Sequence, residues 1–213
     1  MQPTISFRGI GAIPIAIATV LAGCGDGDDS RSVVPSPETT VEFTLPSATL
    51  RVPQRMVAID FARFEDSIAD ELGRRVGGDQ GRQLVQQVRA IAAQGLLDFC
   101  AFDPSTPQDG FAEHINVIVA PIPAGFDREA ILAANLDQLR QVGITVVGVD
   151  ELDCGDRTFD RVRTRLDRTR SEGQVYLLSN GGSLHTITFT ANPESSEAFL
   201  GGSEEIMREY RPR

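Results

Sequence analysis

The chain has 213 residues and a formal net charge of −10 at neutral pH. A balance this acidic argues against nucleic-acid binding, which needs basic surfaces that displace counterions from phosphate groups. It argues equally against adsorption to anionic lipid by charge alone, so any membrane association has to come from another feature of the sequence.

The first 23 residues have the composition of a secretory signal peptide. Arg8 is their only charged residue, and the apolar run from Gly9 to Val20 is shorter than the roughly 20 residues that a membrane-spanning helix needs. This segment ends in Leu21-Ala22-Gly23-Cys24, which resembles the lipobox of bacterial lipoproteins, in which the cysteine thiol receives a diacylglyceryl group and becomes the new N-terminus. The resemblance implies removal of residues 1–23 and lipidation of Cys24. The alternative is an ordinary secreted protein with a free cysteine near its start.

A lipid at Cys24 implies attachment to a membrane on its extracytoplasmic side. One acyl chain holds a protein only marginally, whereas two or more anchor it stably. Gly25 stands where an aspartate is associated with inner-membrane retention, so the outer membrane is the expected location in a cell that has one. Residues 24–40 are rich in Gly, Asp, Ser and Pro, which predicts a flexible linker. Residues 41–213 then suit a single globular domain.

The first half of this domain is predicted to contain a hairpin, a long helical segment, a strand pair and a capped helix. The hairpin turns around Pro46-Ser47, and residues 56–94 are mostly helical with a break at Gly77-Gly78. Asp127 is the expected N-cap of the next helix and Gly143 its end. The predicted strands are Val41–Leu45, Thr49–Val52, Leu96–Phe102, His114–Pro121 and Ile144–Val149.

The second half is predicted to contain three strands and a final helix. Asn180-Gly181 is the preferred dipeptide of a type I′ turn and sets Leu177 opposite Leu184. The helical stretch from Pro193 to Tyr210 is expected to be interrupted at Gly201-Gly202. The three strands are Arg157–Leu166, Gln174–Ser179 and Ser183–Thr190.

Alternation along the last hairpin places apolar residues on both faces of the sheet. One face carries Val175, Leu177 and Leu184, and the other carries Tyr176, Leu178, Ile187 and Phe189. A sheet of this kind is covered on both sides. The order of elements therefore predicts an α+β fold, an α/β/α sandwich with a largely antiparallel sheet.

The cysteines predict a disulfide. If Cys24 carries lipid, Cys100 and Cys154 remain as a pair in an oxidising compartment, and we expect a Cys100–Cys154 bond. The alternative is two buried free thiols. Neither cysteine has the CxxC or CxH companion of a metal site, so no metal is expected.

Motifs for catalysis are missing from the sequence. It has no GxSxG, and its Gly pairs lack the lysine and setting of a phosphate-binding loop. His114 begins a predicted strand and is expected in a capping or surface role. The hairpin turn sets His185 opposite Tyr176, which predicts a buried hydrogen bond between them. The alternative for His185 is a general base or a ligand contact.

The most unusual cluster is a run of arginines in the 157–166 strand. Alternate residues of a strand share a face, so Arg161, Arg163 and Arg165 are expected to project together. Val162, Thr164 and Leu166 would then face the core. Asp156, Asp160, Asp167 and the acidic helices are expected to neutralise the arginines. The alternative is an anion site for a lipid headgroup, a phosphorylated or carboxylated envelope ligand, or an acidic partner protein.

Several segments resemble the PsbP/Mog1-like fold, and in arrangement the bacterial lipoproteins of the LpqN and DcrB type. The resemblance covers roughly residues 40–210. It rests on Ile115–Val119 followed by Pro121, Pro123 and an acidic helix start, on Thr188–Ala191, on Phe199, and on Glu205-Ile206-Met207. It implies a non-catalytic accessory or binding domain, with no catalytic residue and no cofactor.

Together these features predict a lipid-anchored extracytoplasmic accessory protein that binds an envelope partner protein or lipid and is not an enzyme. The alternative is a carrier of lipid or of a small hydrophobic ligand, which needs an apolar cavity between sheet and helices. An envelope hydrolase is disfavoured because the residues for it are missing. A cluster of Tyr176, His185 and an acid lining a cleft would favour the enzyme again.

Overall fold

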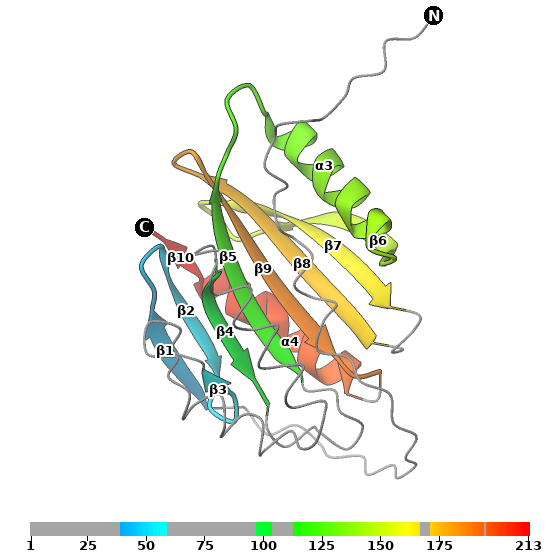
Figure 1. Cartoon of the computed structure of the whole chain (residues 1–213). Helices are drawn as coiled ribbons and strands as arrows, with labels where there is room; N and C mark the ends of the chain where they lie inside the picture. The colour runs from blue at the N-terminus through cyan, green and yellow to red at the C-terminus, as the bar shows by residue number, and fades with distance from the viewer. Residues whose placement is uncertain (1–38, 59–96, 104–112, 167–170, 194) are drawn as a thin grey trace, which may run out of the picture.

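The computed structural model describes residues 39–58, 97–103, 113–166, 171–193 and 195–213 (Figure 1). The signal peptide, the lipobox, most of the linker and most of the predicted helical segment at 56–94 lie outside the described residues. The described part is built on a seven-stranded sheet whose neighbours are all antiparallel, in the order β3-β4-β5-β9-β8-β7-β6. Its strands are β3 (Val57–Ala58), β4 (Leu97–Phe102), β5 (His114–Pro121), β6 (Thr145–Asp153), β7 (Thr158–Leu166), β8 (Ser171–Asn180) and β9 (Ser183–Ala191).

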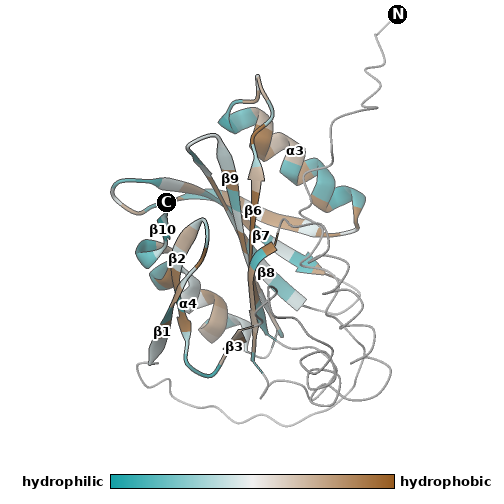
Figure 2. Cartoon of the chain, turned by 60° about the vertical axis from the view of Figure 1, so that its left-hand side comes forward, coloured by the Kyte–Doolittle hydropathy of each residue, from teal (hydrophilic) through white to brown (hydrophobic). Residues whose placement is uncertain are grey.

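A second, three-stranded sheet and two helices cover the large sheet. The small sheet has the order β1-β2-β10, and its strands are β1 (Thr40–Thr44), β2 (Ala48–Pro53) and β10 (Arg211–Pro212). The helices are α3 (Arg128–Gln141) and α4 (Ser196–Glu209). Figure 2 shows the large sheet nearly edge-on, with α3 on one side and α4, β1 and β2 on the other. The predicted α+β class with a largely antiparallel sheet is confirmed.

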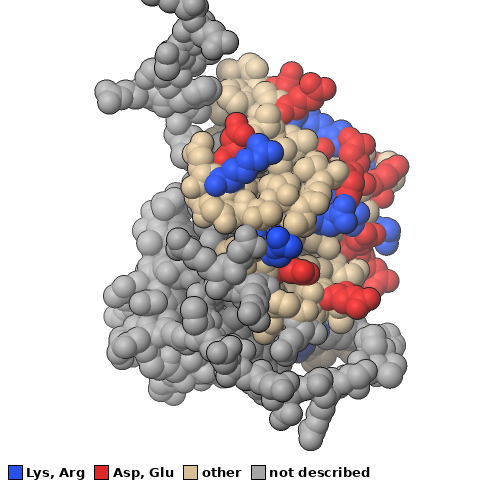
Figure 3. Space-filling model, turned by 90° about the vertical axis from the view of Figure 1, so that its right-hand side faces the viewer, with Lys and Arg blue, Asp and Glu red and all other residues tan. Residues whose placement is uncertain are grey.

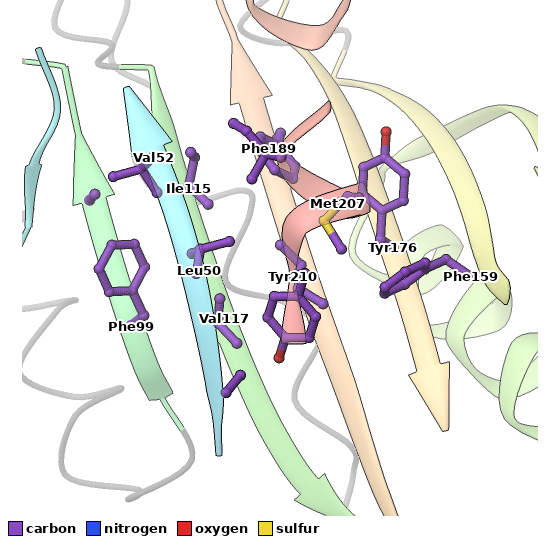
Figure 4. Packing of buried hydrophobic residues seen from close by; sticks show 14 of the residues in the cluster. Leu50, Val52, Phe99, Ile115, Val117, Phe159, Tyr176, Phe189, Met207 and Tyr210 are labelled. Carbon is purple, nitrogen blue, oxygen red and sulfur yellow. The ribbon is translucent and has the colours of Figure 1, made fainter. Parts of the chain in front are cut away.

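The core has one apolar cluster on each side of the large sheet. The larger cluster lies on the α4 side, where residues of β2 pack with residues of β4, β5, β9 and α4 (Figure 4). Aromatic rings meet edge-on within it, with ring centroids of Phe159 and Tyr210 6.2 Å apart and those of Tyr176 and Phe189 5.7 Å apart. The smaller cluster, on the α3 side, joins Ile131 and Leu139 of α3 to residues of β7, β8 and β9. Burial of each such side chain stabilises the fold by about 1.5–3 kcal/mol.

The caps of α3 follow the sequence, whereas α4 differs from the prediction. The Oδ1 atom of Asp127 accepts a hydrogen bond from the Ala130 backbone N at 2.8 Å, and Gly143 ends the helix with φ 80°. In contrast, α4 runs without interruption through Gly201 and Gly202, so the predicted break is wrong. Buried residues on both sides of the glycine pair hold the helix against the sheet, which offsets the roughly 1 kcal/mol cost of each glycine.

The β8–β9 hairpin turns one residue later than predicted. Asn180 pairs with Ser183, and the two-residue loop is Gly181-Gly182, with φ values of 56° and 82°. A type I′ turn needs positive φ at both central positions, which two glycines adopt without steric cost. Leu177 consequently lies opposite Thr186 and not Leu184.

This shift moves each partner by two residues and therefore keeps every side chain on its predicted face. The predicted division is confirmed by the two core clusters. Val175, Leu177 and Leu184 belong to the α3-side cluster, and Tyr176, Leu178, Ile187 and Phe189 belong to the α4-side cluster.

The predicted Cys100–Cys154 disulfide is wrong, because both thiols are free in the structure. Cys100 lies on β4 and Cys154 directly follows β6, and β5, β9, β8 and β7 stand between those two strands. At about 4.8 Å per strand, this separation greatly exceeds the about 4.4–6.8 Å between Cα atoms that a disulfide requires. Cys154 also packs against the α4-side cluster, whereas alternation along β4 directs Cys100 to the other face.

Candidate functional site

Strand β7 carries the predicted arginine row. Val162 and Leu166 belong to the α3-side cluster, as expected, and the Thr164 side chain is also buried. Arg161, Arg163 and Arg165 occupy the alternate positions and therefore project to the opposite face, where they are partly or fully exposed. The predicted direction of the arginine side chains is therefore confirmed. The structure also identifies the acidic residues that pair with them.

Arg161 is held between two carboxylates, one on a neighbouring strand and one on α4. Its Nε atom donates to Asp150 Oδ1 on β6 at 2.5 Å, and its Nη1 atom donates to Glu204 Oε1 on α4. These bonds raise the pKa of the Arg161 guanidinium, with the hydrogen bond to Asp150 as the largest cause. The Arg161 side chain is 19% exposed and joins the edge of the sheet to α4.

The acidic helices contribute as predicted, through Glu204 of α4, whereas Asp156 and Asp160 have other partners. Asp160 binds Arg128 of α3, with Nη2–Oδ1 at 2.7 Å, and Asp156 pairs with Arg157. Asp167 lies outside the described residues. The local neutralisation of Arg161 therefore comes from a neighbouring strand and from α4. Figure 3, which faces the side of the molecule carrying β6 and α3, shows acidic and basic side chains interspersed on this surface.

The Arg163 side chain lies across the neighbouring strand β6 at Gly148. Its Nη2 atom lies 3.2 Å from Asp150 Oδ2, and its side chain is 51% exposed. A Cβ atom on Gly148 would lie 2.6 Å from the same nitrogen, so the absence of a side chain there lets the guanidinium lie across β6. Arg163 and the exposed Arg165 are the members of the row that can meet an anion from outside.

His185 forms a buried hydrogen bond with a tyrosine, but not with Tyr176. Its Nδ1 atom lies 2.7 Å from the Tyr210 hydroxyl at the end of α4. The Tyr176 hydroxyl instead donates to Gln174 Oε1 at 2.5 Å and lies 2.8 Å from Ser203 Oγ. The predicted Tyr176–His185 pair is therefore wrong, and each tyrosine links the sheet to α4 separately. Burial lowers the pKa of His185, which favours its neutral form.

His114 does not have the expected surface role, because its side chain is buried on the α3 side of the large sheet. Together with five other buried polar residues on that side it forms what we call the polar face. Its members are His114, Asn116, Thr164, Thr186, Thr188 and Thr190, and none is more than 5% exposed. The repeat Thr186-x-Thr188-x-Thr190 was the signal in the sequence, but threonine is also common in half-exposed strands, so the repeat did not reveal burial.

The register of the sheet places these polar residues side by side. Asn116 of β5 pairs with Thr188 of β9, and the row below it pairs His114 with Thr190. Thr190 in turn pairs with Gly173 of β8, which pairs with Thr164 of β7. A Cβ atom on Gly173 would lie 2.7 Å from Thr164 Oγ1. Only a glycine at position 173 therefore leaves room for the Thr164 side chain.

A third polar cluster ties the β1–β2 hairpin to the far end of the sheet. The Arg55 Nε atom donates to Asp103 Oδ2 at 2.5 Å, and its Nη2 atom lies 3.4 Å from Glu113 Oε2. The guanidinium carbon also lies 5.8 Å from the ring centroid of Phe199, on the α4 side. Burial raises the pKa of Glu113, and this rise is partly opposed by a hydrogen bond with Ser195 and by the charge of Arg55. These contacts serve to hold the hairpin in place.

Among the residues that the structure describes, no three His, Cys, Asp or Glu side chains gather as a metal ion would require. Neither of the helices placed in the structure is long and apolar enough to cross a membrane.

Comparisons with known proteins bear on the fold. No protein-family model matches the chain, and no curated protein matches it in sequence. The structure is similar to cyanobacterial PsbP (CyanoP) from Synechocystis, with a TM-score of 0.55 and 10% sequence identity over 87% of this chain and 98% of that one. Protein PA94 from Pseudomonas aeruginosa has a TM-score of 0.41 and 9% identity over 82% of this chain and 97% of that one. The likeness to CyanoP shows a PsbP-like fold.

Proposed function

We propose that the protein is a lipid-anchored, extracytoplasmic accessory protein of a bacterial envelope, which binds a partner without catalysing a reaction. The observation that carries this proposal is Leu21-Ala22-Gly23-Cys24, placed directly after a short apolar run and before a polar linker. A signal peptide with this ending directs a protein out of the cytoplasm, and the lipid on Cys24 keeps it at a membrane. The outer membrane is the proposed location in a cell that has one.

The fold supports a binding role, although a fold alone does not determine function. The PsbP-like architecture agrees with the proposed relation to lipoproteins of the LpqN and DcrB type. The chain also lacks the motifs for nucleophilic catalysis. A non-catalytic domain held at a membrane by a linker suits contact with a neighbouring envelope protein.

The surface that we assign to this contact lies on β7, at Arg163 and Arg165. Asp150 and Glu204 already occupy the Arg161 guanidinium, so Arg161 contributes little to the binding of an anion from outside the protein. Arg163 is 51% exposed and paired at only one position, which leaves its remaining donors for a carboxylate or phosphate group. We therefore propose an acidic partner protein, with an anionic lipid headgroup as the competing outcome.

The carrier alternative has less support from the described residues. An apolar ligand would need an apolar lining between the sheet and its covering layer. On the α3 side of the sheet the apolar side chains pack against one another, and the buried polar face described above lies beside them.

The anchor is tested by labelling cells with radioactive palmitate while they express the full chain or its Cys24→Ala variant. We expect label and membrane association for the full chain and neither for Cys24→Ala. The matched control is Cys154→Ala, which keeps both properties. Membrane association that survives Cys24→Ala would contradict the proposal.

The partner surface is tested with the lipidated full chain in its own envelope. The double variant Arg163→Gln, Arg165→Gln is compared with Arg140→Gln, which removes an exposed arginine from α3. Crosslinking to a specific envelope protein should weaken in the double variant only. Equal crosslinking in all three would exclude this surface, and loss of binding to anionic vesicles instead would assign it to lipid.

A further inference from the structure

The polar face has hydrogen-bonding atoms that remain unpartnered although they are buried. Among the residues that the structure describes, both amide atoms of Asn116 and the Thr190 hydroxyl have no hydrogen-bond partner. Asn116 and Thr190 are each only 1% exposed. Buried polar groups in native proteins are almost always hydrogen-bonded, because an unmade bond leaves the cost of desolvation uncompensated. These atoms therefore call for a partner that is not a side chain of the described fold.

We propose that the polar face binds an uncharged small molecule that carries hydroxyl or amide groups. This inference does not depend on the lipid anchor or on Arg163, because those features lie elsewhere in the chain. It assigns a second ligand, of a different chemical class, to the same domain.

The geometry brings the unpartnered atoms within reach of one ligand. Asn116 and Thr190 lie on adjacent strands as diagonal neighbours, because Asn116 pairs with Thr188 and Thr190 pairs with His114. Diagonal neighbours of this kind are separated by about 7–8 Å, a span that one small molecule can bridge. An asparagine amide supplies one acceptor and a donor group, and a threonine hydroxyl supplies both. Groups that both donate and accept match hydroxyl and amide groups.

The distribution of charge selects an uncharged ligand. Arg55, which pairs with Asp103 and Glu113, lies over the Phe199 ring and so on the α4 side of the sheet. On the α3 side, the Asp160 carboxylate is occupied by Arg128. No charged side chain of the described residues belongs to the polar face, so a charged ligand would be buried there without a counterion.

The fold itself does not demand polar residues at these positions. Val162, Val175 and Leu177 occupy the same face in neighbouring strands and pack in the α3-side cluster. Valine has nearly the shape of threonine and packs well in strands, so it could fill the Thr190 position without an unpartnered hydroxyl. Polar residues in this place are better explained by recognition than by packing.

The test uses saturation-transfer NMR on the full chain in detergent micelles. The probes are glucose, myo-inositol and propionamide, compared with glucuronate, glucosamine and cyclohexane carboxylate. We expect transfer to at least one neutral probe and a loss of tenfold or more in its affinity in Asn116→Leu and in Thr190→Val. Ser203→Ala is the matched control, because Ser203 is equally buried but lies on α4, on the other side of the sheet, where its Oγ atom donates to Leu200 O at 2.6 Å.

Thermal unfolding of the same variants separates recognition from a structural role. An apolar replacement of an unpartnered polar group should leave the midpoint unchanged or raise it. A midpoint that falls by many degrees in both Asn116→Leu and Thr190→Val would show that these groups serve the fold, and would overturn the proposal. Absence of binding by every neutral probe, preference for a charged probe, or binding unaffected by either variant would overturn it as well.

Discussion

The Nδ1 atom of His185 lies 2.7 Å from the hydroxyl oxygen of Tyr210, deep between the large sheet and the end of α4. The two rings meet nearly edge-on, with centroids 5.9 Å apart. Tyr210 is completely buried, and burial raises its pKa, so its hydroxyl stays protonated and can donate to a neutral histidine. The pair thus fixes the last turn of α4 and the start of β10 to the core, and makes this link sensitive to pH.

Stability should fall on acidification because of His185. Burial lowers its folded-state pKa below the ordinary histidine value of 6.5, so the unfolded chain binds the proton more readily. The contribution of neutral His185 is therefore fully present above pH 6.5 and is lost as the pH falls below it towards the folded-state pKa. Urea unfolding between pH 7.5 and 5.0 should show this loss.

The matched variants are His185→Gln and Tyr210→Phe. His185→Gln removes the titrating group and should flatten the stability profile over this pH range. Tyr210→Phe removes the hydrogen bond but keeps the buried imidazole, so the slope should persist at lower overall stability. An unchanged slope in His185→Gln would contradict the assignment.

Arg161 should contribute more stability than its neighbour Arg163. Arg161→Gln breaks ion pairs to both Asp150 and Glu204 and should lower the free energy of unfolding by about 1 kcal/mol. Arg163→Gln loses one exposed pair and should cost about 0.5 kcal/mol or less. Denaturant titration of both variants and of Glu204→Gln measures these changes. The double variant Arg161→Gln, Glu204→Gln should cost less than the sum of the single changes, because the two residues share one interaction.

Alanine at the glycine pair of α4 should stabilise the protein. Gly201 and Gly202 are exposed within the helix, and nothing lies within 4 Å of a Cβ atom built on either. Each change to alanine should raise the free energy of unfolding by about 0.5–1 kcal/mol, because alanine loses less backbone entropy on folding. Gly182→Ala is the control and should destabilise, because its φ of 82° is strained for any residue with a Cβ. Calorimetry that shows destabilisation by Gly201→Ala would indicate an unrecognised need for glycine there.

Local patterns were the predictable part of this fold. The Asp127 cap, the strands at β4, β5 and β7, and the two faces of the last hairpin follow from spacing that the sequence displays directly. The arginine row also follows, because alternation along one strand requires no knowledge of its neighbours. Long-range pairing was not accessible in this way. Asp150 and Glu204 meet Arg161 only because β6 pairs with β7 and α4 crosses the sheet.

Two errors have the same physical origin. The cysteine count favoured a disulfide, but the strand order puts β4 and β6 far apart, and strand order is not encoded locally. His114 was expected near the surface because it begins a strand, whereas its neighbours Phe102 and Thr190 enclose it within the sheet. In both cases the environment is set by strands distant in sequence.

The two thiols should react at very different rates. Cys100 is buried, and burial raises its pKa to about 12, so almost no thiolate is present near neutral pH. Cys154 is more exposed, and although partial burial raises its pKa as well, nearby Arg157 and Arg208 partly oppose this rise. A Cys24→Ser variant treated with Ellman's reagent at pH 8 should therefore release one equivalent quickly and the second only on unfolding. Cys154→Ser in the same background should abolish the fast phase. If the Cys24→Ser chain instead shows no reactive thiol even when unfolded, Cys100 and Cys154 form a disulfide and the prediction is wrong.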